Sequence, residues 1–310
     1  MTVTDTRELV HEIVREVQAE LIAAFEAVER DGAPVAGLPP GTFVAAPWER
    51  PGGGGGTARV LTEGAVFERA GVNVSAVTGD EVPPSIWQER PGTRGHPYFA
   101  TGVSMVLHPR NPYVPAFHAN LRYFEAGDDW WFGGGMDLTP SYGFEDDARH
   151  FHRTLKAYVE RHGVIEYQAA KEWCDRYFFL PHRKEMRGIG GIFFDNLHPE
   201  GEGMFERTLA FVRDGAEAII AAYLPIVRRR LTTPYGERER SWQLYRRGRY
   251  AEFNLAFDRG TRFGLQTDGN IEAILMSLPP LARWEFQYRP EPGSPEARMA
   301  SFLVPQDWAA

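Results

Sequence analysis

The segment GVSMVLHPRNPYVPAFHANLRYFEAGDDWWFGGGMDLTP, residues 102–140, decides the fold of this 310-residue chain. Two runs within it, GVSMVLH and AFHANLRYF, carry apolar residues at alternate positions, which is the pattern of a β-strand with one buried face. Because alternate residues of a strand point to the same side, His118, Asn120 and Arg122 share one face. We therefore predict a strand with one apolar face and one face equipped for chemistry.

The first run has the same organisation. Ser104, Val106 and His108 share one side, and the other side is apolar: Val103, Met105 and Leu107. A sheet that serves only packing would rarely place imidazole, amide and guanidinium groups in succession on one face. The Gly-rich turn GGGMD that follows allows a close approach of the backbone to a ligand, and Asp137 at its end fits either a turn or a functional carboxylate.

Four helices are predicted from apolar residues at helical spacing. They cover residues 5–30, 145–162, 166–179 and 204–223, and the second should stop at Gly163. None of them is part of a detectable internal repeat.

Further strands are predicted over residues 59–77, 190–197, 251–258 and 283–289. Strands therefore occur both in a hairpin-like cluster and between helices. This order favours an α+β fold with an antiparallel sheet over a doubly wound parallel sheet. We assign residues 1–40, an N-terminal helix and linker, to the same single domain as residues 41–310.

Two Gly-rich stretches do not fit a nucleotide-binding loop. Residues 31–58 contain five consecutive glycines and are predicted to form a flexible loop, without the Lys-Ser/Thr that ends a phosphate-binding loop. The stretch RGIGG, residues 187–191, lacks the dinucleotide spacing and precedes its strand instead of following it.

The net charge of 34 − 42 = −8 does not favour a nucleic-acid partner. Residues 228–249 nevertheless hold eight arginines against two glutamates, which fits a small polyanionic ligand, a subunit contact or a solvated basic loop. The single cysteine, Cys174, excludes an internal disulfide and multi-cysteine metal sites. With no apolar run of about 18–20 residues and no signal-peptide pattern, a cytoplasmic location is expected.

Over residues 40–290 the chain resembles the oxygen-dependent coproporphyrinogen III oxidases. The resemblance rests on the opening segment and on the blocks HFHRTLKAYVERHG, WCDRYFFLPHRKEMRGIGGIFFDNL and RGTRFGLQTDGNIEAILMSLPP. It implies one large flat antiparallel sheet with helices on both sides, and a homodimer. It also implies oxidative decarboxylation of two propionates of coproporphyrinogen III to vinyl groups, giving protoporphyrinogen IX in haem biosynthesis, with molecular oxygen as oxidant and no required cofactor.

The resemblance assigns roles to residues of the chemically equipped face. His118 corresponds to the proton donor, and Asp137 to the carboxylate aimed at the centre of the macrocycle. Ser104, Arg122 and the backbone around Asn120 and Leu121 correspond to anchors of the propionates; a guanidinium matches carboxylate oxygens geometrically. From the residues alone, His118 also fits a structural hydrogen bond across the sheet, and Arg122 an internal salt bridge to a residue such as Asp137.

One further substrate segment departs from the family. Where the family usually has Gly-Gly-Arg or Gly-Ser-Arg, this chain has Asp268, Gly269 and Asn270, so the arginine that would neutralise a propionate is missing. Main-chain N–H groups at the start of the next helix, or another arginine, are the candidates for this contact.

Four histidines match those that some members of the family are suggested to use for a divalent metal: His108, His118, His152 and His182. Imidazole is the commonest transition-metal ligand, yet the spacings do not form a compact metal motif and the chemistry is generally regarded as metal-independent. A metal-dependent oxygenase therefore remains an alternative function. A catalytically inactive tetrapyrrole-binding protein is the other, supported only by the altered segment at residues 268–270.

The expected subunit contact corresponds to residues 247–278. Within it, Phe253, Leu255 and Phe257 would give a strand one apolar face that needs either a helix of the same chain or a partner subunit. The flanking arginines Arg246, Arg247 and Arg249 would then form the polar rim of the interface.

Overall fold

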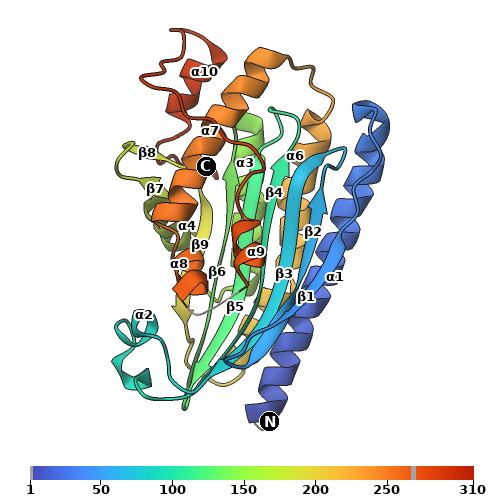
Figure 1. Cartoon of the computed structure of the whole chain (residues 1–310). Coiled ribbons are helices and arrows are strands. Elements are labelled where there is room, and N and C mark those ends of the chain that lie inside the picture. Colours follow the sequence, from blue (N-terminus) through green and yellow to red (C-terminus); the bar gives the residue numbers. More distant parts are fainter. Residues whose placement is uncertain (1–2, 267–269) are drawn as a thin grey trace.

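A single antiparallel sheet forms the centre of the molecule. Across residues 3–266 and 270–310, which the computed structural model describes, seven strands pair in the order β1-β2-β3-β4-β5-β6-β9 (Figure 1). Their bounds are β1 (Val44–Glu49), β2 (Gly54–Thr62), β3 (Phe67–Gly79), β4 (Tyr98–Pro109), β5 (Ala116–Ala126), β6 (Asp129–Thr139) and β9 (Gly191–Leu197). A small separate sheet pairs β7 (Phe179–Leu180) with β8 (Glu185–Met186).

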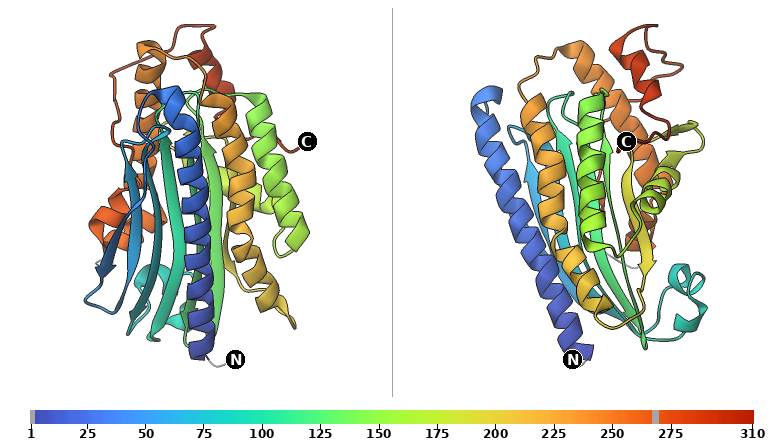
Figure 2. Two further views of the ribbon diagram at one scale, coloured as in Figure 1. Left: turned by 90° about the vertical axis from the view of Figure 1, so that its right-hand side faces the viewer. Right: turned by 180° about the vertical axis from the view of Figure 1, so that it is seen from behind.

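One face of the sheet is covered by a layer of long helices (Figure 2). These are α1 (Val3–Ala36), α3 (Glu145–His162), α5 (Met204–Arg213) and α6 (Gly215–Arg230). The apolar face predicted for β5 lies against them: Phe117 and Leu121 are buried in the main core together with apolar residues of these helices. This arrangement leaves the polar faces of β4 and β5 to the opposite side of the sheet.

The second face is covered only in part, by α7 (Glu237–Ala256) crossing one end of the sheet and by α4 (Tyr167–Tyr177) against β9 (Figure 1). Shorter elements surround them: α2 (Pro84–Trp87), η1 (Pro91–Thr93), α8 (Arg259–Gln266), α9 (Ile271–Leu275), α10 (Pro295–Arg298) and η2 (Met299–Ser301). None of the helices described is long and apolar enough to cross a membrane.

The predicted α+β class, antiparallel sheet, flanking helices and single domain are confirmed. The helix at 145–162 is also confirmed, and it ends at Gly163 in the left-handed conformation, with φ of 58°. The boundary at residue 40, between the N-terminal helix with its linker and the rest of the domain, stays a prediction; α1 itself packs against β3 and β4.

Several local predictions are wrong. Residues 54–56 of the predicted loop lie in β2, where all three pair with β3 and Gly55 and Gly56 also pair with β1, because glycines without a side-chain pattern can still complete a backbone ladder. The helix predicted at 204–223 is two helices that meet at Asp214. No regular strand is present at residues 283–289, which lie within the described part of the chain.

The error at residues 251–258 bears on the predicted interface. These residues belong to α7 up to Ala256. Residues two apart on a helix are rotated by about 200° around its axis, so their side chains lie on nearly opposite sides. Phe253 is accordingly buried while Leu255 is 55% exposed, so the predicted one-sided apolar stripe does not exist. The arginines expected at its rim, Arg246, Arg247 and Arg249, are buried and paired with glutamates of the same chain.

Candidate functional site

The register of β4, β5 and β6 brings the predicted site residues onto one face, which we call the site face. Ser104 lies opposite Asn120, and His118 opposite Asp137, on adjacent strands. Paired residues of neighbouring strands project to the same side. Leu121 is the exception, because its side chain is buried in the core on the other side and only its backbone belongs to the site.

Around these residues the site face carries small side chains. Arg122 of β5 pairs with Gly133 of β6 on one side and with Gly102 of β4 on the other. The same row continues from Gly102 to Ser75 of β3 and Gly56 of β2. In the adjacent row Ser104 is exposed and Asn120 is followed by Gly135. A sheet surface with so little side-chain bulk leaves room for a large ligand to lie against it.

The most connected polar group of this face consists of three side chains. His118 Nδ1 lies 2.8 Å from Asp137 Oδ1, and Arg187 Nη2 donates to both carboxylate oxygens at 2.9 and 2.8 Å. Burial alone would raise the pKa of Asp137, but the Arg187 guanidinium and His118 outweigh burial and lower it. Asp137 is therefore ionised and accepts the proton of His118 Nδ1. It lies within β6 and is buried, and is not the exposed turn residue that GGGMD suggested.

Arg122 occupies the next row of the site face. Its guanidinium donates to Asn120 Oδ1 at 2.7 Å and lies 2.8 Å from Asp195 Oδ2, with 38% of its side chain exposed. The internal salt bridge considered for Arg122 thus exists, but its partner is Asp195 of β9, not Asp137. A Cβ atom at Gly133 would lie only 2.8 Å from Arg122 Nε, so this glycine makes room for the ion pair.

Of the segment that departs from the family, the structure describes only Asn270, at the start of α9. Asn270 caps α9 by accepting from the Ala273 N–H at 3.0 Å, while Asp268 and Gly269 lie outside the described residues. The carbonyl of Ala273 accepts from Asn73 of β3 at 2.9 Å. This contact ties α9 to the site face beside Ser104, which pairs with Asn73.

The four candidate metal ligands do not form a common site. His152 is buried with its ring nitrogens against the Tyr167 hydroxyl and the Ile189 carbonyl; His108 Nε2 bonds the Ser277 carbonyl; and His182 pairs with Glu252. Burial lowers the pKa of His108 to about 3 and that of His152 to about 4. Within the described residues, no three His, Cys, Asp or Glu side chains are grouped to hold a metal ion. The donor set does not fit a shared metal, and we derive no step through one.

Sequence reasoning missed two charged residues of this site, Arg187 and Asp195. Arg187 was noticed only as the start of RGIGG, and its partner Asp137 is 50 residues away. Asp195 follows an apolar run, as any residue at the end of a buried strand would. Neither residue carries a local signal of its role, because each acquires it through a contact between distant segments.

Known proteins are similar to this chain over almost its whole length. The model of the family described as Coproporphyrinogen III oxidase matches residues 9–308. A relative from Parasynechococcus marenigrum (strain WH8102), named oxygen-dependent coproporphyrinogen-III oxidase, is 50% identical over 327 residues, covering 98% of this chain and 88% of the relative. Relatives of the same name from Synechococcus sp. strains CC9902 and CC9605 are each 49% identical over 328 residues, with the same coverage.

Proposed function

Because the chain belongs to the coproporphyrinogen III oxidase family, we propose that it converts coproporphyrinogen III to protoporphyrinogen IX with molecular oxygen, as an enzyme of haem biosynthesis. The observation that carries this proposal is the site face, on which His118, hydrogen-bonded to Asp137, and the partly exposed Arg122 lie beside small residues. Each of two propionate side chains reacts with one O2 and one proton. It becomes a vinyl group, and CO2 and hydrogen peroxide are released.

The substrate supplies the electrons in this proposal. The porphyrinogen is electron-rich, so its pyrrole can react with oxygen directly, and the protein needs only to bind, orient and move protons. His118 moves protons through Nε2, because Nδ1 is held by Asp137. Arg122, Ser104 and the backbone at Asn120 and Leu121 hold propionates.

Asp137 is the residue whose direct contact with substrate is most constrained. Three hydrogen bonds already use its carboxylate, which has about four acceptor positions. Pyrrole N–H groups would share the remaining position, and the side chain is only 2% exposed. Contact with the macrocycle therefore requires either this one position or a rearrangement of the group on binding.

Product analysis tests the function. The purified protein is incubated in air with coproporphyrinogen III, and we expect protoporphyrinogen IX with two equivalents of both CO2 and hydrogen peroxide. No product should form without oxygen, and a chelator should leave the rate unchanged. Tight binding of the substrate without turnover would instead identify a tetrapyrrole-binding protein, while loss of turnover on chelation would identify a metal-dependent oxygenase.

A homodimer is part of the proposal, supported by exposed apolar side chains rather than by the predicted strand. Beside α7, where the Trp284 indole donates to Glu252 at 3.0 Å, Trp284 is 55% and Phe286 92% exposed. Leu255 and Phe257 near the end of α7 are exposed as well. Such surfaces mark protein–protein contacts. Sedimentation at micromolar concentration should show a dimer, and a fully active monomer would exclude it.

A further inference from the structure

Arg187 is a buried charge that is bonded directly to a residue of the site face, Asp137. It precedes β9, only 1% of its side chain is exposed, and its guanidinium is surrounded by the rings of Phe178, Tyr250 and Phe253, at 4.1, 4.4 and 4.8 Å from the ring centroids. Its Nη2 atom bonds both oxygens of Asp137. Asp137 is thus held by one guanidinium nitrogen, Nη2, within an aromatic enclosure.

The guanidinium is fixed from a second side. Its Nη1 atom donates to Asn254 Oδ1 at 2.8 Å, and the Asn254 amide lies 3.3 Å from the Ser277 hydroxyl. The Ser277 carbonyl in turn lies 2.9 Å from His108 Nε2. A continuous chain of polar contacts therefore leads from His118 through Asp137 and Arg187 to α7 and to the segment that follows α9.

Stability alone does not explain this arrangement. Replacing a buried ion pair by well-packed apolar residues is often neutral or stabilising, so such a pair is weak evidence for a stabilising role. Here the carboxylate has a further partner, the His118 imidazole on the site face. A carboxylate that orients an imidazole selects its tautomer and its direction, and these decide which nitrogen moves a proton.

We propose that Arg187 is a positioning residue for porphyrinogen oxidation: it fixes the Asp137 carboxylate so that Asp137 holds His118 with Nδ1 protonated and Nε2 directed to the reaction. The kinetic consequences of this inference rest on the proposed function, whereas the positioning of His118 by Arg187 and Asp137 does not depend on it. Because Arg187 is buried, it acts through Asp137 and His118 and not on the substrate. Both terminal nitrogens of the guanidinium are required, because Nη2 bonds the two oxygens of Asp137 while Nη1 bonds Asn254, and a lysine ammonium has a single nitrogen that cannot span both partners.

Steady-state kinetics with coproporphyrinogen III test the kinetic part. Arg187→Met should lower kcat by about 100-fold, the usual cost of a misplaced catalytic group, while KM changes less than about threefold. Arg187→Lys should recover part of kcat. The matched control is Arg247→Met, which removes another buried arginine paired with a carboxylate, Glu68 at 2.7 Å, and should leave kcat within about threefold of wild type.

A double variant keeps the test decisive if Arg187→Met does not fold. Asp137→Asn/Arg187→Met leaves no unpaired charge, and it should be as slow as Asp137→Asn alone, because Arg187 acts only through the carboxylate. Wild-type kcat in Arg187→Met, a large rise in KM, or a double variant about tenfold slower than Asp137→Asn would each overturn the proposal.

A spectroscopic measurement separates this inference from the proposed function. In protein labelled with 15N-histidine and without substrate, the Nδ1–H proton of His118, assigned through its loss in His118→Gln, should be observed in the wild type and in Arg247→Met. It should broaden or vanish in Arg187→Met. An unchanged signal in that variant refutes positioning by Arg187. If the Nδ1–H signal of His118 is lost in Arg187→Met but the wild type shows no turnover, the proposed function fails and the positioning role stands.

Discussion

At the scale of single residues, the contrast between Arg122 and Arg187 shows how environment separates two similar side chains. Both are paired with an aspartate, but Arg122 is 38% exposed on the site face whereas Arg187 is enclosed by three rings. An exposed guanidinium can exchange its internal partner for a ligand carboxylate at little desolvation cost. An enclosed one cannot, because breaking its pair would leave a charge buried.

Arg122→Lys is the prediction at this scale. The Arg122→Lys variant should bind substrate almost as poorly as Arg122→Ala, with the KM for coproporphyrinogen III raised about tenfold or more. The reason is that an ammonium group keeps only one of the two charge-assisted hydrogen bonds that a guanidinium makes to a carboxylate. Steady-state kinetics measure this. Arg238→Lys, which alters a similar bidentate contact to Glu296 away from the site face, should leave KM unchanged. A lysine variant with wild-type KM and kcat would show that Arg122 holds no carboxylate.

At the scale of elements, a glycine of β6, Gly133, leaves room for the side chains of Arg122 and Asp195. Gly133 lies beneath the Arg122–Asp195 pair, and a Cβ atom there would be 2.8 Å from Arg122 Nε and 2.6 Å from Asp195 Oδ1. Both atoms lie toward the ends of side chains, which can move more easily than backbone. The strand itself should therefore tolerate a methyl group while the site does not.

Gly133→Ala should consequently fold with little loss of stability but bind substrate several-fold less tightly, because Arg122 is displaced. Thermal unfolding and KM, measured on the same preparation, separate the two effects. Gly92→Ala, where an added Cβ has no neighbour within 4 Å among the described residues, is the control and should change neither quantity. Unaltered KM in Gly133→Ala would mean that the position of Arg122 over β6 is unimportant for binding.

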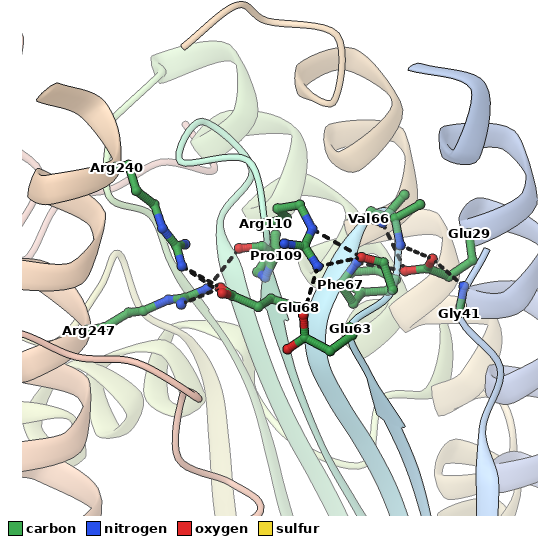
Figure 3. Close-up of polar contacts among 12 residues, drawn as sticks. Glu29, Gly41, Glu63, Val66, Phe67, Glu68, Pro109, Arg110, Arg240 and Arg247 are labelled. Carbon is green, nitrogen blue, oxygen red and sulfur yellow. Dashed lines mark hydrogen bonds and ion pairs between the residues drawn. The ribbon is translucent and has the colours of Figure 1, made fainter. Parts of the chain in front are cut away.

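The attachment of α1 to the sheet depends on one buried carboxylate. Glu29 accepts hydrogen bonds from four backbone N–H groups: those of Gly41 (2.8 Å), Ala65 (2.7 Å), Val66 (3.0 Å) and Phe67 (2.7 Å) (Figure 3). These groups belong to the segment before β1 and to the connection between β2 and β3. One side chain thus joins three segments that are separated in the sequence.

Glu29→Gln should lower the free energy of unfolding by about 2–3 kcal/mol, because an amide N–H2 replaces one acceptor and faces backbone donors. Urea titration measures the change. Glu26→Gln is the control on the same helix, since Glu26 accepts a backbone hydrogen bond from the Phe43 N–H at 2.9 Å, and about 1 kcal/mol or less is expected there. Equal effects of the two substitutions would contradict the anchoring role of Glu29.

At the scale of the whole molecule, buried histidines make stability depend on pH. Burial lowers the pKa of His108 to about 3 and of His152 to about 4, against about 6.5 in an unfolded chain. Between these values the unfolded state binds more protons than the folded state, so stability rises with pH and is lost as pH falls below about 6.5. Each such histidine contributes a slope of up to about 1.4 kcal/mol per pH unit.

We therefore expect the free energy of unfolding, measured by urea titration, to fall steadily from pH 7 to pH 5. Ion-paired Glu68 titrates below this window because its pKa is lowered, whereas burial raises the pKa of Asp175. His152→Gln should flatten the slope, whereas substitution of the exposed His96 by Gln should not. Stability that does not change between pH 7 and pH 5 would show that neither buried histidine remains neutral.

The sequence by itself determined those features that repeat over short distances. Alternation in AFHANLRYF placed His118, Asn120 and Arg122 on one face, and helical spacing with a terminal glycine defined α3 to the residue. Such patterns are local, because burial of one face imposes its period on consecutive residues. Reliance on local patterns also caused the error at residues 251–258. There Phe253, Leu255 and Phe257 alternate as in a strand, although they lie at the C-terminal end of α7.

Only the tertiary structure decided which charged groups meet. Arg187 bonds Asp137, which lies 50 residues away in the sequence. Arg122 pairs with Asp195, although Asp137 was the partner considered from the sequence. Buried arginines of α7 pair with glutamates of other segments, as Arg247 does with Glu68. Ion pairs of this kind depend on the register of strands and the packing of helices, which no short segment encodes. The physical reason is that a pair is stable only where burial and geometry coincide, and both are properties of the assembled fold.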